Sequence, residues 1–267
     1  MLDDFLIRSL LAGSLMVLVA APMGCLMVWQ RLAFLADTLG HASVLGIALA
    51  LILALQPVVG VLLVIAVIMF IVRLSTGDKP IALSESVLAI ISHTGLAAGI
   101  LLLGVFGFGN ISLEALLFGD LLATTVTDLV FITITVALLM GLLWWRWYQF
   151  VAVSVSPEIA QAEGIPVKKI QLILYLMIAL LIAVMMKIMG VLLIGAMLVI
   201  PVNAARNFSR SPEQMMLISL LFGALSLYSG VFFSWQFDWQ TGPAIVVVAA
   251  AWLLVSIVVK KLNKALT

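Results

Sequence analysis

Charged residues are scarce in this 267-residue chain: Asp, Glu, Lys and Arg together make up 9% of it, whereas 65% is hydrophobic. A soluble domain is about 25% charged, and a chain with so few polar groups cannot cover a water-facing surface. The composition therefore excludes a soluble enzyme and a disordered protein. With 13 basic and 12 acidic residues the net charge is +1, so the chain also lacks the basic surface that nucleic-acid binding requires.

Cysteine occurs once, at Cys25, which excludes an internal disulfide and a cysteine-based zinc cluster. A phosphate-binding loop of the form Gly-x-x-x-x-Gly-Lys-Ser/Thr is also missing, because Gly77-Asp78-Lys79 has neither the upstream glycine nor the hydroxyl residue. The chain contains no His-Glu-x-x-His motif and no Gly-x-Ser-x-Gly elbow of a hydrolase. We therefore predict that it is not an enzyme and does not bind ATP through such a loop.

Long, unbroken apolar runs fill most of the sequence. A segment that crosses hydrocarbon must satisfy its own backbone hydrogen bonds, and these runs lack the apolar–polar alternation of barrel strands, so they are helices. One crossing needs about 20 apolar residues. We predict an all-α polytopic membrane protein, a single domain over residues 1–267 with about eight to nine transmembrane helices. The spans lie near 5–28, 33–55, 57–73, 84–105, 126–147, 169–187, 190–205, 213–235 and 243–260.

The stretch 106–125 is apolar but is interrupted by glycines, Glu114 and Asp120. We predict an irregular or re-entrant segment there, covered by protein. If nine spans are present and the C-terminus is cytoplasmic, eleven of the 13 basic residues lie on the cytoplasmic side, and Arg8 and Lys187 are the exceptions. This bias follows the positive-inside rule and would disappear if 106–125 crossed the membrane.

Two ionisable residues stand inside the predicted span 33–55. Asp37 and His41 are four residues apart, which places them on one helical face about one turn apart. His41 lies ten residues beyond Arg31 at the predicted cytoplasmic boundary, which is a depth of about 15 Å and the middle of a ~30 Å core. Ionisable groups at such a depth are costly and mark ion or proton pathways. A purely structural ion pair is the alternative.

The second histidine, His93, lies nine residues beyond Ser84 in the predicted span 84–105, at a depth of about 13 Å. Imidazole and carboxylate groups suit zinc, so we predict a transient divalent-metal site formed by Asp37, His41 and His93. A site with so few ligands suits an ion that must leave again. Two alternatives stay open: these groups relay protons, or the histidines bind backbone carbonyls in a structural role.

The longest polar stretch, 148–168, separates two predicted spans. Within it, Ser156 can cap a helix and Pro157 suits the first helical position. Gly164 is typical of a helix end. We predict a short cytoplasmic helix over 156–164, which either connects two spans or docks into a partner as a lever.

Several motifs occur in order along nearly the whole chain: Val28–Arg31, Asp37–Ser43, Ile91–His93, Leu117–Leu122, Ser156–Gly164, Ile200–Arg206 and Ser211–Met215. Together they resemble the permease subunits of bacterial zinc-uptake ABC transporters, within the wider zinc, manganese and iron permease family. The resemblance implies a homodimer in the bacterial inner membrane that moves zinc from periplasm to cytoplasm through a pore on its two-fold axis. Zinc is then the transported substrate rather than a permanently bound cofactor.

The resemblance also implies partners: two ABC ATPase subunits on the cytoplasmic face and a periplasmic zinc-binding protein. Three alternatives to a zinc-importing permease stay open. In the first, the transported ion is manganese or iron instead of zinc. In the second, the chain is a stand-alone proton-coupled metal transporter, and in the third it is a membrane scaffold or receptor subunit.

Particular residues match the family pattern. Its intramembrane Asp-x-x-x-His motif matches Asp37 and His41, although the family favours alanine where this chain has Gly40. Pro201 is expected to kink or end its span, and the resemblance makes that helix pore-lining. The family's ATPase-coupling helix matches Ser156, Pro157, Glu158, Ala160, Glu163 and Gly164.

Overall fold

The computed structural model of the protein describes residues 3–76, 85–108 and 113–266. Over these ranges it is helical and contains no strand, so the predicted all-α fold is confirmed. Lys79 and the 109–112 part of the predicted re-entrant segment lie outside the described residues. The elements are α1 (Asp3–Trp29), α2 (Ala33–Ile52), α3 (Pro57–Thr76), α4 (Glu85–Val105), α5 (Leu113–Phe118), the 3-10 helix η1 (Leu121–Ala123), α6 (Val126–Val155), α7 (Pro157–Ala162), α8 (Val167–Ala205), α9 (Pro212–Phe237) and α10 (Thr241–Leu266).

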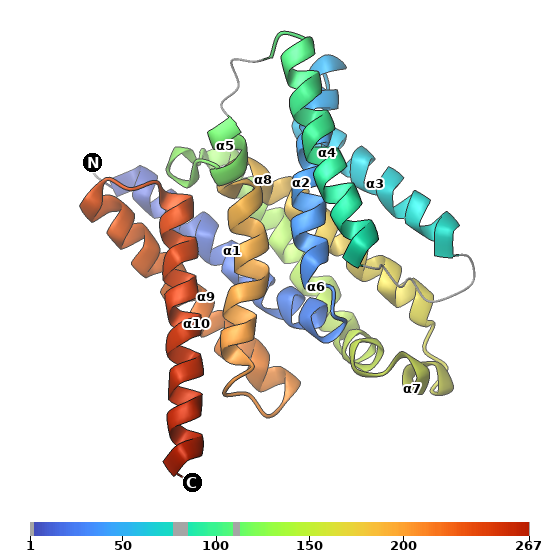
Figure 1. Cartoon of the computed structure of the whole chain (residues 1–267), viewed down its shortest axis with the longest axis vertical. Helices are drawn as coiled ribbons and strands as arrows, with labels where there is room; N and C mark the ends of the chain where they lie inside the picture. The colour runs from blue at the N-terminus through green and yellow to red at the C-terminus, as the bar shows by residue number, and fades with distance from the viewer. Residues whose placement is uncertain (1–2, 77–84, 109–112, 267) are drawn as a thin grey trace.

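Among the described residues, seven helices are long and apolar enough to cross a membrane, namely α1, α2, α4, α6, α8, α9 and α10. The apolar part of α3, Pro57–Ile71, is shorter. The spans predicted at 169–187 and 190–205 are both contained in the 39-residue α8, which is interrupted at Gly190. The two arms of α8 meet at this residue and run in different directions (Figure 1). The chain is a multi-pass membrane protein.

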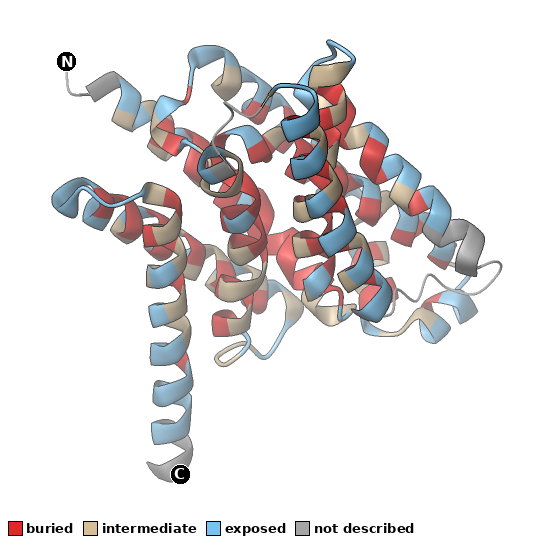
Figure 2. Ribbon diagram, turned by 45° about the horizontal axis from the view of Figure 1, so that its top comes forward, coloured by how far each residue is buried: buried red, intermediate tan, exposed pale blue. Residues whose placement is uncertain are grey.

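Helix α8 forms the centre of the bundle. The other chain segments bury 78% of its most apolar stretch, but only 22% of the most apolar stretch of α6 is buried. Figure 2 shows the same division between buried inner helices and largely exposed outer ones. A helix that is apolar on every side can be buried all round. The outer helices present apolar side chains to their surroundings, as expected for lipid or for another protein chain.

Helices α2 and α4 pack closely because glycines on α4 leave room for the α2 backbone. A Cβ atom added to Gly95 would lie 2.9 Å from Cα of Ala42, and one added to Gly99 would lie 2.6 Å from the backbone nitrogen of Leu45. Such spacing of small residues permits close approach of membrane helices. The middle of α4 is therefore held against the part of α2 that carries the predicted site.

The break in α8 is covered by the segment between α4 and α6. Gly119, at the end of α5, and Gly190 both have φ +67. A Cβ on either glycine would lie 2.4 Å from the backbone nitrogen of the other, so the two backbones touch and neither position has room for a side chain. The described part of 106–125 thus forms short helices that pack on α8, and none of its described residues belongs to a membrane-spanning helix. Most of these residues are exposed or half-buried, so one copy of the chain does not cover the segment as predicted, and a re-entrant course stays a prediction.

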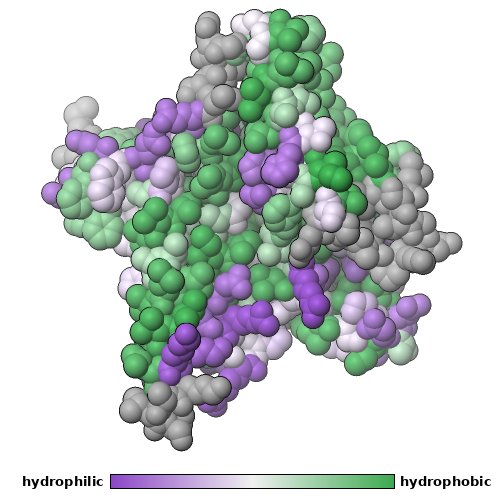
Figure 3. Space-filling model, viewed as in Figure 1, coloured by the Kyte–Doolittle hydropathy of each residue, from purple (hydrophilic) through white to green (hydrophobic). Residues whose placement is uncertain are grey.

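The two ends of the bundle differ. In Figure 1 the N-terminus lies at the same end as α5, whereas α7 and the C-terminus lie toward the opposite end. Hydrophilic side chains gather near the C-terminal end of the face shown in Figure 3. Asn207 donates to Ser256 Oγ at 2.9 Å and accepts a hydrogen bond from Lys260 at 3.2 Å, which ties α10 to the α8–α9 connection. A cytoplasmic location of this end stays a prediction.

Candidate functional site

The predicted site lies on α2, which is held in place by two hydroxyl side chains. Thr38 Oγ1 donates to the backbone oxygen of Phe34 at 2.8 Å and also lies 3.3 Å from the backbone oxygen of Leu88 on α4. Ser43 Oγ donates to the backbone oxygen of Gly40 and lies against the sulfur of Met186 on α8. Both hydroxyl residues are fully buried. Because α2 is fixed against two helices, the orientation of its Asp37 and His41 side chains is set by the surrounding bundle.

His41 uses one ring nitrogen for contacts within the protein. Its Nδ1 lies 3.0 Å from the backbone oxygen of Asp37, 3.2 Å from Ser92 Oγ and 3.4 Å from Asp37 Oδ2. A carbonyl oxygen can only accept, so this geometry favours the tautomer that carries its proton on Nδ1. The lone pair of Nε2 is then available for a metal ion, and the contacts at Nδ1 orient the ring as outer-shell partners of metal-binding histidines do.

Ser92 is the residue that sequence reasoning missed. It is 1% exposed and lies beside His41, although it is next to His93 in the sequence. A lone serine in an apolar helix carries no signal of its own, because its usual partner is the carbonyl four residues earlier. Its position in the motif Ile91-Ser92-His93 was the only available indication.

The site is open on one side and closed on the other. The Asp37 side chain is 42% exposed and that of His41 is 24% exposed. On the closed side, a Cβ on Gly195 of α8 would lie 3.8 Å from Asp37 Oδ1, and a Cβ on Gly40 would lie 2.9 Å from Val191 Cγ1. The second arm of α8 therefore forms the wall behind the site. Contact with Val191 gives a physical reason for glycine at position 40.

His93 does not join Asp37 and His41 within one chain. The side chain of His93 is exposed on α4, and the described residues contain no group of three or more His, Cys, Asp or Glu side chains that could hold a metal ion. One copy of the chain thus brings one carboxylate and one imidazole together. The role of His93 as a ligand stays a prediction.

The short helix predicted over 156–164 is present as α7, which spans Pro157–Ala162. Ser156 Oγ caps it by accepting from the backbone N–H of Ile159 at 3.4 Å, and Gly164 follows it with φ +80. Ala160 is buried against the bundle at 1% exposure, whereas Ile159 is 63% exposed. This helix therefore has an anchored face and a free apolar side chain.

Two acidic residues complete the ends of α7. Glu158 lies in the first turn, where a negative charge is favourable, and its carboxylate accepts from Ser156 Oγ at 3.1 Å. Glu163, the C-terminal capping residue, accepts a hydrogen bond from the Tyr148 hydroxyl of α6 at 2.8 Å. The helix is thus joined to α6 by a side-chain contact as well as by the chain itself.

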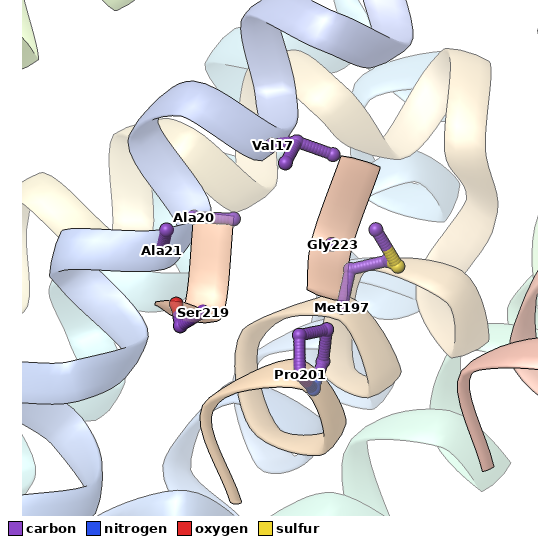
Figure 4. Close-up of a pocket in the computed structure, with 7 residues that line it drawn as sticks. All are labelled: Val17, Ala20, Ala21, Met197, Pro201, Ser219 and Gly223. Atoms are coloured by element: carbon purple, nitrogen blue, oxygen red, sulfur yellow. The ribbon is translucent and has the colours of Figure 1, made fainter. Parts of the chain in front are cut away.

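Pro201 does not end its helix. Helix α8 continues through Pro201 to Ala205, and the residue within it that has non-helical dihedral angles is Gly190, with φ 67 and ψ 166. Pro201 removes the N–H donor for the carbonyl of Met197, but packing against neighbouring helices can hold a membrane helix together across a proline. A small gap lies beside it between α1, α8 and α9 (Figure 4). A pore-lining role for this helix stays a prediction.

Comparison with known proteins identifies the family. A protein-family model described as "ABC 3 transport family" matches residues 2–260. The chain belongs to the ABC 3 transport family. It is 35% identical over 254 residues to the "High-affinity zinc uptake system membrane protein ZnuB" of Haemophilus influenzae, which covers 95% of this chain and 97% of that protein. The resemblance inferred from the motifs is therefore confirmed, and the chain is a transport component.

The chain is also similar to a manganese-transport protein and to a solved structure. The "Manganese transport system membrane protein MntC" of Halalkalibacterium halodurans is 27% identical over 249 residues, which cover 92% of this chain and 84% of that protein. The solved structure "PsaBC from Streptococcus pneumoniae in complex with Fab" matches with a TM-score of 0.85 and 29% identity, covering 95% of this chain and 91% of that chain. The fold of the chain is thus that of an ABC transporter permease.

Proposed function

We propose that the chain is the membrane-spanning subunit of a bacterial ABC importer that carries zinc from the periplasm to the cytoplasm. The observation that carries this proposal is the Asp37–His41 pair on α2, in which Nδ1 is occupied and Nε2 is free to meet an ion. Similarity supports zinc over manganese, because the zinc-uptake relative from Haemophilus influenzae is 35% identical and the manganese relative is 27% identical.

Two copies of the chain would complete the site. Zinc in proteins is usually four-coordinate, and two copies related by a two-fold axis would supply two carboxylates and two imidazoles. Asp37 is half-buried and His93 is exposed on the packed pair α2 and α4, and exposure of such groups to lipid is costly. We infer that this face lines the pore in a homodimer, where these groups hold zinc briefly and then release it.

Energy for transport would come from partner subunits. The chain has no phosphate-binding loop, so two ATPase subunits on the cytoplasmic side would supply ATP hydrolysis, and α7 would dock into them through its exposed Ile159. A periplasmic zinc-binding protein would deliver the ion. The protein would lie in the bacterial inner membrane with its C-terminus in the cytoplasm.

Zinc uptake into proteoliposomes tests this proposal. The complex with its ATPase should accumulate zinc only when ATP is present, and the chain alone should not accumulate zinc under a pH gradient. The double variant Asp37→Ala and His41→Ala should abolish uptake, while Asp238→Asn, a change in an exposed turn that keeps a residue tolerant of positive φ, should not. Uptake by the chain alone would contradict an ABC importer and support a proton-coupled transporter.

A further inference from the structure

Helix α6 is longer than one membrane crossing requires. Its 30 residues correspond to about 45 Å, against a hydrocarbon core of about 30 Å. The helix is interrupted at Arg146, which has φ −114 and ψ 16. Arg146 lies twenty residues after Val126, and a rise of about 30 Å over that distance places it at the far boundary of the hydrocarbon. The bend therefore falls where the lipid headgroups begin.

Large aromatic side chains surround this bend and face outward. Trp144, Trp145 and Tyr148 are 84%, 72% and 67% exposed. Between them Trp147 turns inward and its Nε1 reaches Glu213 Oε1 at 3.5 Å, while Phe150 is fully buried. The inward aromatics fix the segment on the bundle. The outward ones match the enrichment of Trp and Tyr at membrane–water interfaces.

The outward aromatics continue the exposed apolar face of α6. Phe131, Ile134 and Leu138 are exposed, and their spacing of three and four residues places them on one helical face. Trp145, seven residues after Leu138, continues that face to the bend at Arg146, and Tyr148 follows just beyond the bend. Since Phe131, Ile134 and Leu138 are apolar, this part of the face is suited to acyl chains, and the aromatic end is suited to the interface at the level of the headgroups.

Arg146 adds a positively charged group at this end. Its guanidinium carbon lies 4.5 Å from the centre of the Trp145 ring, and Nη1 donates to Gln149 Oε1 at 2.7 Å. A guanidinium has five N–H donors and binds phosphate in a bidentate manner. The acidic side chains nearby have other partners: Glu163 accepts from Tyr148, and Glu213 accepts from Trp147.

We propose that Arg146, Trp144, Trp145 and Tyr148, here called the α6 elbow, bind the headgroup of an anionic phospholipid and that this lipid controls coupling through α7. The proposed control of coupling rests on the proposed function. Its structural basis is the hydrogen bond from Tyr148, an elbow residue, to Glu163 at the end of α7. A lipid that holds the α6 elbow at the membrane surface thereby also restrains the C-terminal end of α7, the helix proposed to dock into the ATPase.

Lipid binding and coupling can be measured separately on the assembled complex in nanodiscs. Native mass spectrometry with phosphatidylglycerol mixed into phosphatidylcholine reports binding, and the zinc transported per ATP hydrolysed in matched proteoliposomes reports coupling. One interfacial cation contributes about 1 kcal/mol to anionic-lipid binding, or roughly five-fold. Arg146→Gln should weaken phosphatidylglycerol binding by about that factor and lower coupling, and Arg146→Lys should keep part of both. Arg210→Gln, a charge change on the α8–α9 connection, should leave both unchanged.

The outcomes separate this proposal from the proposed function. Lipid binding that depends on Arg146, without ATP-driven zinc uptake in any lipid, would contradict the importer but keep the lipid site. Zinc uptake that is equal in both lipid mixtures, with no Arg146-dependent lipid binding, would overturn the lipid site but keep the importer. Brominated lipid should quench the fluorescence of Trp144 and Trp145. If the ATPase or a second copy of the chain protects them from this quenching, the lipid site would also be overturned.

Discussion

Replacing Gly190 with alanine tests the link between the break in α8 and the segment that covers it. The dihedral angles of Gly190, φ 67 and ψ 166, belong to a region that only glycine adopts easily, and a side chain there costs about 1–3 kcal/mol. The new Cβ would also lie 2.4 Å from the backbone of Gly119 and 2.4 Å from that of Leu117, and overpacking of this kind costs about 1–3 kcal/mol. Together the two effects predict a loss of roughly 2–6 kcal/mol.

Thermal unfolding in detergent measures this loss. A change of 1 kcal/mol shifts the melting temperature of a chain of this size by about 2–4 °C, so Gly190→Ala should melt at least about 4 °C lower than the native protein. Gly119→Ala should behave alike, because its Cβ would lie 2.4 Å from the backbone nitrogen of Gly190. Zinc uptake should fall too, since the arm that begins at Gly190 carries Gly195 behind Asp37.

Gly141→Ala is the matched control. Gly141 is also in an apolar helix, but a Cβ there meets nothing within 4 Å, and alanine favours a helix over glycine by about 1 kcal/mol. This variant should melt at the native temperature or slightly above it. If Gly190→Ala also melts within a degree of the native protein, the contact between the two backbones does not support the bundle as argued here.

Three other substitutions give further tests. Ser92→Ala removes a contact to Nδ1 of His41. Because loss of such outer-shell partners weakens metal binding, the zinc concentration for half-maximal uptake should rise about ten-fold. An unchanged value in transport assays would exclude a role of Ser92 in orienting His41. Lys187 and Asp128 form an ion pair of 2.8 Å in which the lysine is 69% exposed. A double-mutant cycle of melting temperatures should therefore give a coupling free energy between the two side chains below about 1 kcal/mol. A larger value would show that the pair is shielded from water. Ile159→Glu on the exposed side of α7 should reduce co-purification of the ATPase without lowering the melting temperature, and full co-purification would argue against docking there.

Much of the fold could be predicted because its signals are local. Apolar runs gave the helices, and Ser156 with Pro157 and Gly164 indicated both ends of α7. The separation of two spans between 187 and 190 also agrees with the interruption at Gly190. These features depend on propensities and caps, which neighbouring residues determine.

The remaining features depend on residues far apart in the sequence. The contact of Gly119 with Gly190 joins segments about seventy positions apart, and nothing near either glycine reveals it. The proximity of Ser92 to His41 arises from the packing of α4 on α2. Pro201 shows the opposite error: a strong local signal for a helix end is overridden by tertiary packing, so α8 continues to Ala205.

X-ray absorption at the zinc edge tests the metal site most directly. For the untagged complex with one zinc bound per dimer, we predict imidazole nitrogen at about 2.0–2.1 Å from the metal, and His41→Ala should lower that nitrogen signal. His93→Ala, measured in the same way, would decide whether the second histidine is a ligand. A nitrogen signal that is unchanged in His41→Ala would contradict the central claim that zinc rests on this imidazole during transport.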